Sequence, residues 1–265
     1  MRVLSIAYHD IGEDWLAHRQ DPRGAANVYR LGRPAFQAHL QSIIDRGAAQ
    51  RVRTLGRPQH CISPVPVLLT FDDGAETAYL IAAEELERHG WRGHFFVVTK
   101  WIGRPGFLDV EQIRSLHARG HVIGSHTHSH PRRMSELEWA DMLWEWSESC
   151  AALSDILGEP VTVASVANGF YSRRVAEAAA AAGIEILFNS EPTPDVDIVD
   201  GTLVLGRYSV HRKTHPGFSG AVAAGKLWPR WRQAQCWQFK KMLKSVAGRP
   251  YASIRRHVLC IKSLT

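Results

Sequence analysis

Short apolar runs alternate along most of the chain with longer segments of mixed polarity. The runs are rich in Val, Ile, Leu and Phe and are bounded by polar or turn-forming residues, which is typical of buried strands. We therefore expect strands at Val3–Tyr8, Val65–Phe71, His94–Val98, Val122–Ser125, Thr162–Ala164, Ile184–Asn189 and Leu203–Tyr208.

The intervening segments place apolar residues at helical spacing. In the first of them, apolar side chains recur at Phe36, Leu40, Ile43 and Ile44, the period that lines one face of a helix. Gly90, Gly158 and Gly183 each directly follow one of these segments and serve as stop signals. We expect helices at Pro34–Arg46, Thr77–His89, Val110–Arg119, Ser135–Leu157 and Ser172–Ala182.

This alternation of strand and helix predicts an α/β fold. Parallel strands covered by helices produce such a pattern, and about seven strands in one continuous run favour a single barrel-like domain over residues 1–211. Catalytic groups of such barrels gather at the carboxyl ends of the strands. Polar residues that directly follow a predicted strand are therefore the first candidates for a site.

Composition agrees with a globular protein. The chain has 265 residues, 45% of them hydrophobic, enough for a substantial core. No stretch approaches the roughly 20 apolar residues that cross a bilayer, and the apolar start is too short for a signal peptide. We expect a cytoplasmic protein, peripheral at the inner membrane if it meets one. The four cysteines are too widely spaced for a zinc knuckle or a redox pair.

Charge is divided unevenly along the chain. Residues 212–265 hold twelve of the 32 Lys and Arg residues and no Asp or Glu, which leaves 20 bases against all 26 acids before residue 212. Trp228, Trp231 and Trp237 lie among these bases, as in segments that rest on anionic membranes. A solvated surface, or pairing with the acidic body, stays open as an alternative.

We therefore expect residues 212–265 to form a basic, Trp-containing helical extension at the C-terminus. No helix-turn-helix, zinc-finger or RNA-binding signature accompanies its bases. We expect no nucleic-acid partner, and we expect an anionic membrane surface as the partner of the extension.

Two segments at the ends of predicted strands carry metal-binding chemistry. The run Thr70-Phe71-Asp72-Asp73-Gly74 closes one strand with two carboxylates, and His126 and His130 follow another strand at a spacing of four. Residues four apart on a helical turn face the same side, so two imidazoles can share one ion. With Asp73 they make a three-ligand set that suits Zn²⁺, or Co²⁺, Ni²⁺ or Mn²⁺, and leaves a position for water.

The neighbouring carboxylates suggest a division of labour. At a strand end followed by glycine, both Asp72 and Asp73 can reach one pocket. One carboxylate then binds the metal, and the other accepts a proton from the water. Taken alone, Asp-Asp-Gly is equally typical of a strand-to-helix turn.

The two segments resemble the first two motifs of the polysaccharide deacetylase family, the NodB-homology or carbohydrate esterase 4 group. The spacing between them and the run Gly120–Ser125 are also similar to that family, over roughly residues 1–210. Ala7-Tyr8-His9-Asp10 and Tyr29–Asp45 resemble the deacetylases linked to exopolysaccharide synthesis. The resemblance implies a NodB-like, distorted (β/α) barrel with fewer than eight strands.

The resemblance also implies the roles of the site residues. Asp73, His126 and His130 would hold a divalent metal, and Asp72 would be the general base. The implied reaction removes an N-acetyl group from an amino sugar of a polysaccharide or a lipid-linked precursor, with metal-bound water attacking the amide. The implied partner is thus an N-acetylated glycan or a lipid-linked amino sugar.

Part of the family pattern is missing. The third motif usually supplies an arginine and prolines, yet the corresponding stretch Val163–Tyr171 has neither, so the residue that orients Asp72 is open. Within it, Asn168 and Tyr171 are candidates for substrate binding. The candidates further along the chain are His211 for the general acid and Arg207, which either pairs with a site carboxylate or belongs to the surface.

Two other functions remain open at this point. The same site suits a deformylase or another amidase acting on a lipid-linked sugar. A catalytically impaired, carbohydrate-binding relative would keep the metal ligands but has no need of a proton acceptor. The presence of Asp72 beside Asp73 argues against that second alternative.

Overall fold

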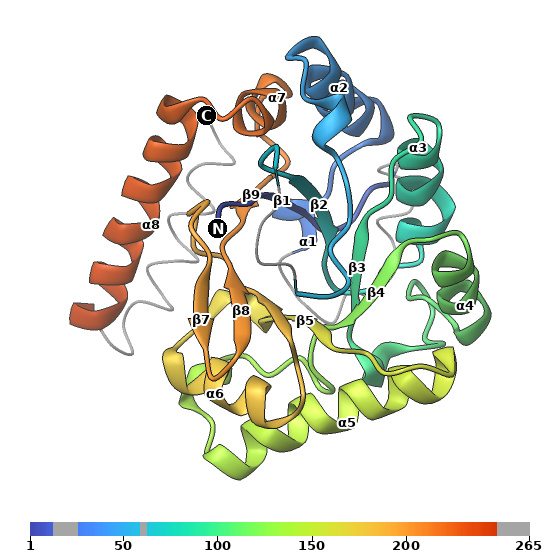
Figure 1. Cartoon of the computed structure of the whole chain (residues 1–265), viewed down its shortest axis with the longest axis vertical. Helices are drawn as coiled ribbons and strands as arrows, with labels where there is room; N and C mark the ends of the chain where they lie inside the picture. Colours follow the sequence, from blue (N-terminus) through green and yellow to red (C-terminus); the bar gives the residue numbers. More distant parts are fainter. Residues whose placement is uncertain (13–25, 59–62, 248–265) are drawn as a thin grey trace.

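A computed structural model describes residues 1–12, 26–58 and 63–247 and shows a strongly curved sheet surrounded by helices (Figure 1). Within these residues the strand order is β7-β8-β6-β5-β4-β3-β2-β1-β9, and every pair except the β7–β8 hairpin is parallel. The strands are β1 Leu4–Tyr8, β2 Val67–Phe71, β3 His94–Val97, β4 Val122–Ser125, β5 Val163–Ser165, β6 Ile186–Phe188, β7 Asp197–Val199, β8 Thr202–Leu205 and β9 Tyr208–Ser209. The predicted distorted barrel is confirmed.

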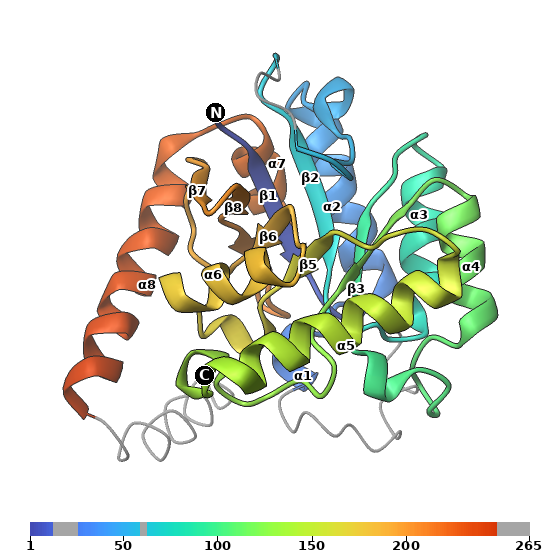
Figure 2. The ribbon, with the colours of Figure 1, turned by 60° about the horizontal axis from the view of Figure 1, so that its bottom comes forward.

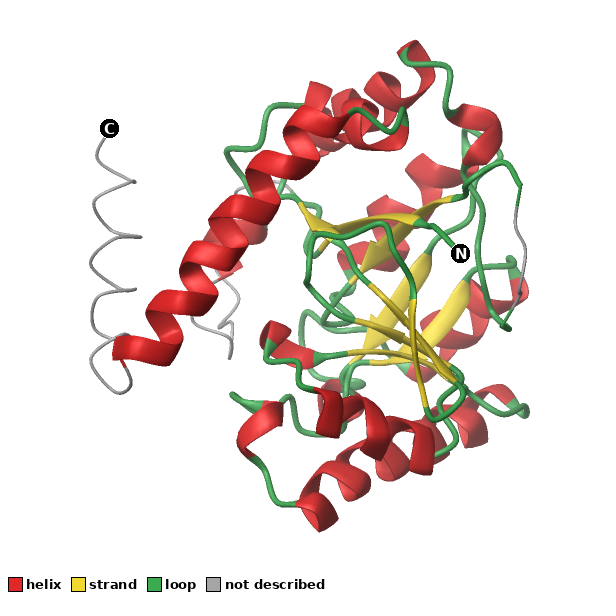
Figure 3. Cartoon of the chain, turned by 60° about the vertical axis from the view of Figure 1, so that its left-hand side comes forward, coloured by secondary structure: helices red, strands yellow, loops and turns green. Residues whose placement is uncertain are grey.

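The helices cover the outer face of this sheet (Figures 1 and 3). They are α1 Ala26–Tyr29, α2 Arg33–Asp45, the π-helical η3 Ala78–Ala83 running into α3 Glu84–Glu87, α4 Val110–Ala118, α5 Trp139–Leu157, α6 Arg173–Ala181, α7 Gly217–Ala223 and α8 Leu227–Ala247. Single 3₁₀ turns are η2 Ala49–Arg51, η4 Thr99–Trp101, η5 Met134–Glu136 and η6 Ala167–Gly169. All five predicted helical segments are found, with altered ends.

Each central strand supplies two cores, because successive side chains point to opposite faces. In β2, Leu68 faces the barrel interior and packs with Phe96 and Phe188. Leu69 and Phe71 of the same strand face outward, beneath the helices. The near-continuous apolar runs of the sequence follow from this double burial.

One predicted strand, Leu203–Tyr208, is wrong as a single element. The chain leaves β8, which pairs with β6, and enters β9, which pairs with β1 at the other edge of the sheet. A Cβ at Gly206 would lie 2.3 Å from the carbonyl oxygen of Glu191, so this crossing needs glycine. The break directs Arg207, only 1% exposed, into the barrel.

The barrel also closes at its base. The amide of Val3 donates to the carbonyl oxygen of Pro194 over 2.8 Å, and Arg2 forms an antiparallel bridge with Asp195. The start of the chain is therefore tied to the segment that precedes β7. The two edges of the sheet therefore approach each other here through isolated backbone contacts, without the continuous hydrogen bonding of two paired strands.

The helices that follow β9 pack on the barrel. In α7, the hydroxyl of Ser219 lies 2.9 Å from the Tyr8 hydroxyl and 2.7 Å from Nδ1 of His39, in a buried network. In α8, Gln233 donates to the carbonyl oxygen of Ser209 over 2.8 Å. The charge of the sequence changes at residue 212, but the helices that follow pack on the barrel. A separate extension over residues 212–265 stays a prediction.

The helix α8 runs along the side of the barrel (Figures 2 and 3). It begins at the end of the barrel where the strands start and runs toward the end where they finish (Figure 2). Among the described residues, no helix combines the length and apolar character required to cross a membrane.

Candidate metal centre

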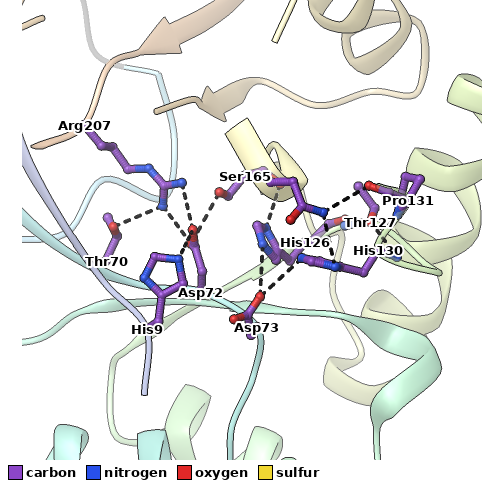
Figure 4. A network of polar contacts seen from close by, with 12 residues as sticks. His9, Thr70, Asp72, Asp73, His126, Thr127, His130, Pro131, Ser165 and Arg207 are labelled. Atoms are coloured by element: carbon purple, nitrogen blue, oxygen red, sulfur yellow. Dashed lines mark hydrogen bonds and ion pairs between the residues drawn. The ribbon is translucent and has the colours of Figure 1, made fainter. Parts of the chain in front are cut away.

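Three side chains meet at the carboxyl ends of β2 and β4 (Figure 4). Oδ1 of Asp73 lies 3.5 Å from Nε2 of His126 and 3.4 Å from Nε2 of His130. One potential ligand atom from each residue lies within 4.8 Å of the other two. The structure therefore brings together the predicted metal ligands, although β3, β4 and the helices between β2 and β4 separate Asp73 from the two histidines in the sequence.

Backbone strain is concentrated around these ligands. Asp73, Thr127, His130 and Asn168 have φ values of 75°, 69°, 59° and 56°, in the left-handed region that non-glycine residues avoid. Each such residue costs on the order of 1 kcal/mol, which the surrounding contacts must offset. Among the described residues, only Asp200, in a hairpin turn, shares this feature without lying at the site.

The hydrogen bonds around His126 fit a metal ligand. Its Nδ1 lies 2.9 Å from the carbonyl oxygen of Ser165. That acceptor requires the proton on Nδ1, which leaves the Nε2 lone pair facing Asp73, as in many metal sites. Burial lowers the pKa of His126, but the Asp72 and Asp73 carboxylates outweigh it and raise the pKa above its ordinary value. Such a centre attracts a positive charge and fits a divalent cation.

Asp72 is held by a different set of contacts. The Arg207 guanidinium donates to its two oxygens over 2.7 and 2.9 Å and to the carbonyl oxygen of Asn189 over 2.9 Å. Burial raises the pKa of Asp72, but Arg207 and His126 outweigh that effect, so the pKa lies below its ordinary value. This carboxyl group is ionised at neutral pH.

Arg207 thus pairs with a site carboxylate, one of the two alternatives that the sequence left open. It holds Asp72 by a bidentate, buried contact, where no arginine is available from the third-motif stretch. Its guanidinium carbon also lies 5.7 Å from the ring centre of Phe96, inside the barrel. The break between β8 and β9 delivers this side chain.

His9 is a site residue that the sequence reasoning missed. Its Nε2 lies 4.0 Å from Oδ2 of Asp72 (Figure 4). Its ring stacks on Tyr29 at 4.4 Å between centroids. Burial lowers its pKa, although Asp73 and Asp72 act in the opposite direction. His9 follows the strand Val3–Tyr8 directly, so the strand-end rule that selected Asp72 could have selected it too.

His211 lies further out. Its ring packs edge-on against Tyr29 at 4.8 Å, and Tyr29 contacts His9 on its other side. A role for His211 as general acid stays a prediction.

The two predicted substrate-binding residues have structural contacts of their own. Nδ2 of Asn168 donates to the carbonyl oxygen of Pro131 over 3.2 Å and lies 3.5 Å from Nδ1 of His130. Tyr171 is half-buried and packs against the core beneath α5 and α6. Their roles toward a substrate stay predictions.

Known proteins resemble this chain in sequence and fold. Residues 61–187 match the family described as Polysaccharide deacetylase. YxkH of Bacillus subtilis, which carries a polysaccharide deacetylase name, is 26% identical over 203 residues, covering 75% of this chain and 70% of its own. A chitin deacetylase of Colletotrichum lindemuthianum is 35% identical over 85 residues, 31% of this chain and 34% of that protein.

A solved structure shows the same fold. The de-N-acetylase of Aggregatibacter actinomycetemcomitans aligns with a TM-score of 0.65 and 19% identity, over 84% of this chain and 100% of that one. Fold and sequence together define a hydrolase of the deacetylase class. The chain carries a polysaccharide deacetylase domain of the NodB-homology, carbohydrate esterase 4 family, as its motifs predicted.

Proposed function

We propose that this protein removes N-acetyl groups from the amino sugars of a glycan with the help of a divalent metal. One observation carries the proposal: the Asp73–His126–His130 cluster lies beside a second, buried carboxylate, Asp72, that Arg207 holds ionised. The names of two relatives, a chitin deacetylase and a de-N-acetylase, support the substrate class. The donor set favours Zn²⁺, with Co²⁺, Ni²⁺ or Mn²⁺ as substitutes.

The residues at the site divide the work of amide hydrolysis. A cation held by Asp73, His126 and His130 would polarise the acetyl carbonyl and stabilise the charge that develops on its oxygen. Asp72 takes a proton as the water oxygen bonds to the carbonyl carbon. Arg207 fixes the orientation of that carboxylate and keeps it ionised between turnovers.

The sugar nitrogen must be protonated before the C–N bond breaks. We assign this transfer to His9, because its Nε2 lies 4.0 Å from Asp72 and its lowered pKa leaves it neutral and able to accept a proton. The proton taken from water passes from Asp72 to His9 and then to the departing nitrogen. Acetate and a free amino sugar are the products.

The test is product analysis with metal-loaded protein. Oligomers of N-acetylglucosamine, a lipid-linked N-acetylated sugar and the matching N-formyl sugars are incubated with the enzyme, and acetate and formate are measured. We expect acetate from the N-acetyl substrates. Formate without acetate would favour the deformylase alternative, and glycan binding without either product would favour the non-catalytic relative.

We further propose that the start of α8 contacts an anionic membrane. Leu227, Trp228 and Trp231 are 75%, 69% and 54% exposed, and the two indoles stack at 5.3 Å between centroids. The neighbouring Lys226 and Arg232 are cationic, and the sequence has no acidic residue after position 212. Exposed indoles beside bases favour the interface of an anionic bilayer.

The third tryptophan of this segment behaves differently. The ring of Trp237 lies 3.7 Å from the place where a Cβ at Gly169 would stand, next to the turn that carries Asn168. It therefore packs toward the site end of the barrel, whereas α8, which carries Trp228 and Trp231 in its first two turns, begins at the opposite end (Figure 2). In this arrangement the metal centre faces away from the bilayer, which suits a glycan that extends from the surface.

Vesicle binding tests the membrane proposal. The double variant Trp228→Ser, Trp231→Ser should lose binding to phosphatidylglycerol vesicles and keep its acetate release from soluble oligomers. Trp144→Ser is the matched control, because Trp144 on α5 is 51% exposed and lies outside the basic segment. Undiminished binding of the double variant, or equal binding of wild type to phosphatidylcholine vesicles, would contradict the proposal.

A further inference from the structure

The loop that carries both histidine ligands is irregular. It spans residues 126–130 and contains two left-handed residues, Thr127 and His130. Its backbone amide at His130 bonds to the Thr127 hydroxyl over 3.1 Å, a local contact that does not connect it to the rest of the protein. The spacing of His126 and His130 therefore depends on what holds the loop from outside.

Glu145 of α5 holds the end of this loop. One carboxylate oxygen accepts the backbone N–H of Ser129 over 2.8 Å, and the other accepts the Ser129 hydroxyl in a short hydrogen bond. Glu145 is only 4% exposed. A buried carboxyl group is costly unless it is hydrogen-bonded, and here both bonds go to the residue before His130.

Ser149, one turn further along α5, holds the start of the loop. It accepts a hydrogen bond from the Ser125 hydroxyl over 2.8 Å, and the Ser125 oxygen in turn accepts the Thr127 amide over 3.1 Å. Residues four apart share one helix face, so a single face of α5 contacts both ends of the loop. The helix is fixed by Trp146, which is fully buried.

We propose that Glu145 is a positioning residue of the metal centre. It sets the separation of the His126 and His130 imidazoles through Ser129, and it touches neither the ion nor the substrate. Groups that orient metal ligands from outside typically change metal affinity 10- to 100-fold when they are removed. The inference rests on the proposed function, because it assumes that this cluster binds a metal.

Cobalt titration of the apoprotein tests the proposal without an activity assay. The Glu145→Met variant keeps the side-chain volume and removes both acceptors, and we expect its Co²⁺ affinity to fall about 10- to 100-fold with altered visible absorption bands. Glu145→Gln keeps an acceptor for the Ser129 amide and should recover part of the affinity. Glu148→Met is the matched control, because Glu148 is exposed on the same helix.

The Ser129→Ala variant removes one of the two hydrogen bonds from the loop side and does not alter the buried helix face. We expect a smaller loss of Co²⁺ affinity than in Glu145→Met. If Glu145→Met lowers the melting temperature of the apoprotein but binds Co²⁺ with wild-type affinity and spectrum, Glu145 is merely structural and the inference is wrong. If wild type itself binds no stoichiometric Co²⁺, the proposed metal function fails together with it.

Discussion

At the scale of the residue, two adjacent carboxylates have acquired different environments. Asp73 faces two imidazoles, whereas Asp72 faces a guanidinium that contacts both of its oxygens. The left-handed backbone of Asp73 turns the two side chains toward neighbouring parts of the same site. Sequence neighbours can therefore serve as a metal ligand and as a base.

Replacing Arg207 tests the state of Asp72. A group whose pKa is lowered in the fold loses its ionised form only as pH falls through that low value, so wild-type Asp72 does not limit activity near neutral pH. In Arg207→Met, burial acts unopposed by the guanidinium and raises the pKa of Asp72. We expect the acidic limb of the kcat/KM profile to move to higher pH.

The Arg207→Lys variant controls for the loss of charge, since lysine keeps the cation but cannot form the bidentate contact. Its acidic limb should move less. Metal content is measured at each pH, so that metal loss is not mistaken for protonation of Asp72. An unchanged profile in Arg207→Met at equal metal content would disprove the role given to Arg207.

Local spacing made part of the site predictable. The sequence selected His126 and His130 as candidate metal ligands by a spacing of four, and Asp72 and Asp73 by their place at the end of an apolar run. The expectation of a helical turn was wrong, because residues 126–130 form an irregular loop with two left-handed residues. The contact of Arg207 with Asp72 was open, because it depends on where two distant strands meet. His9 obeyed the same strand-end rule as Asp72 but lacked a second histidine nearby to draw attention to it.

At the scale of the element, the crossing between β8 and β9 determines the site. Its apolar residues before and after Gly206 have the pattern of one strand, and periodicity carries no information about which edge a strand joins. The β7–β8 hairpin was also missed, although its turn carries a local signal. Its turn, Asp200-Gly201, has φ values of 48° and 89°, and Asp-Gly between short apolar runs is a recognised hairpin signal.

A methyl group at Gly206 should disturb both stability and site. In Gly206→Ala, the Cβ would meet the Glu191 carbonyl oxygen at 2.3 Å, so the backbone must shift and carry Arg207 with it. We expect the free energy of unfolding to fall by about 1–3 kcal/mol or more, with a loss of acetate release beyond that of stability.

Gly56→Ala is the matched control for this substitution. A Cβ there would meet Val122 at 3.7 Å, an ordinary contact, so stability and activity should stay close to wild type. Denaturant unfolding and acetate release measure both variants. If Gly206→Ala is as stable and as active as Gly56→Ala, the crossing does not determine the position of Arg207.

At the scale of the whole molecule, the barrel gathers residues from across the chain. His9 after β1, Asp72 and Asp73 after β2, the histidines after β4 and Arg207 after β8 meet at one end. The alternation of strands and helices predicted this barrel, because the strands are buried on both faces and the helices carry clear apolar stripes. The way its edges close depends on long-range contacts that no local pattern encodes.

Metal binding should therefore stabilise the whole fold. The side chains that would bind the ion lie on separate segments of the chain. An ion that binds only the folded state stabilises it by mass action, by about 2.7 kcal/mol at an ion concentration of one hundred times Kd. For a chain of this length that corresponds to a rise in melting temperature of roughly 5–10 °C. Scanning calorimetry of the apoprotein with and without Zn²⁺ measures this rise in melting temperature. If Zn²⁺ raises the melting temperature of His126→Ala equally, the ion binds elsewhere.

We propose that Asp72 serves as the base of a metal-dependent deacetylase without being a metal ligand. The most direct measurement compares acetate release and metal content in wild type and Asp72→Asn with N-acetylglucosamine oligomers. We expect equal metal content and a loss of turnover of about 10²- to 10⁴-fold, the usual contribution of a general base. Wild-type turnover in the variant would show that Asp72 is not the base, and loss of its metal would show that Asp72 helps to bind the ion.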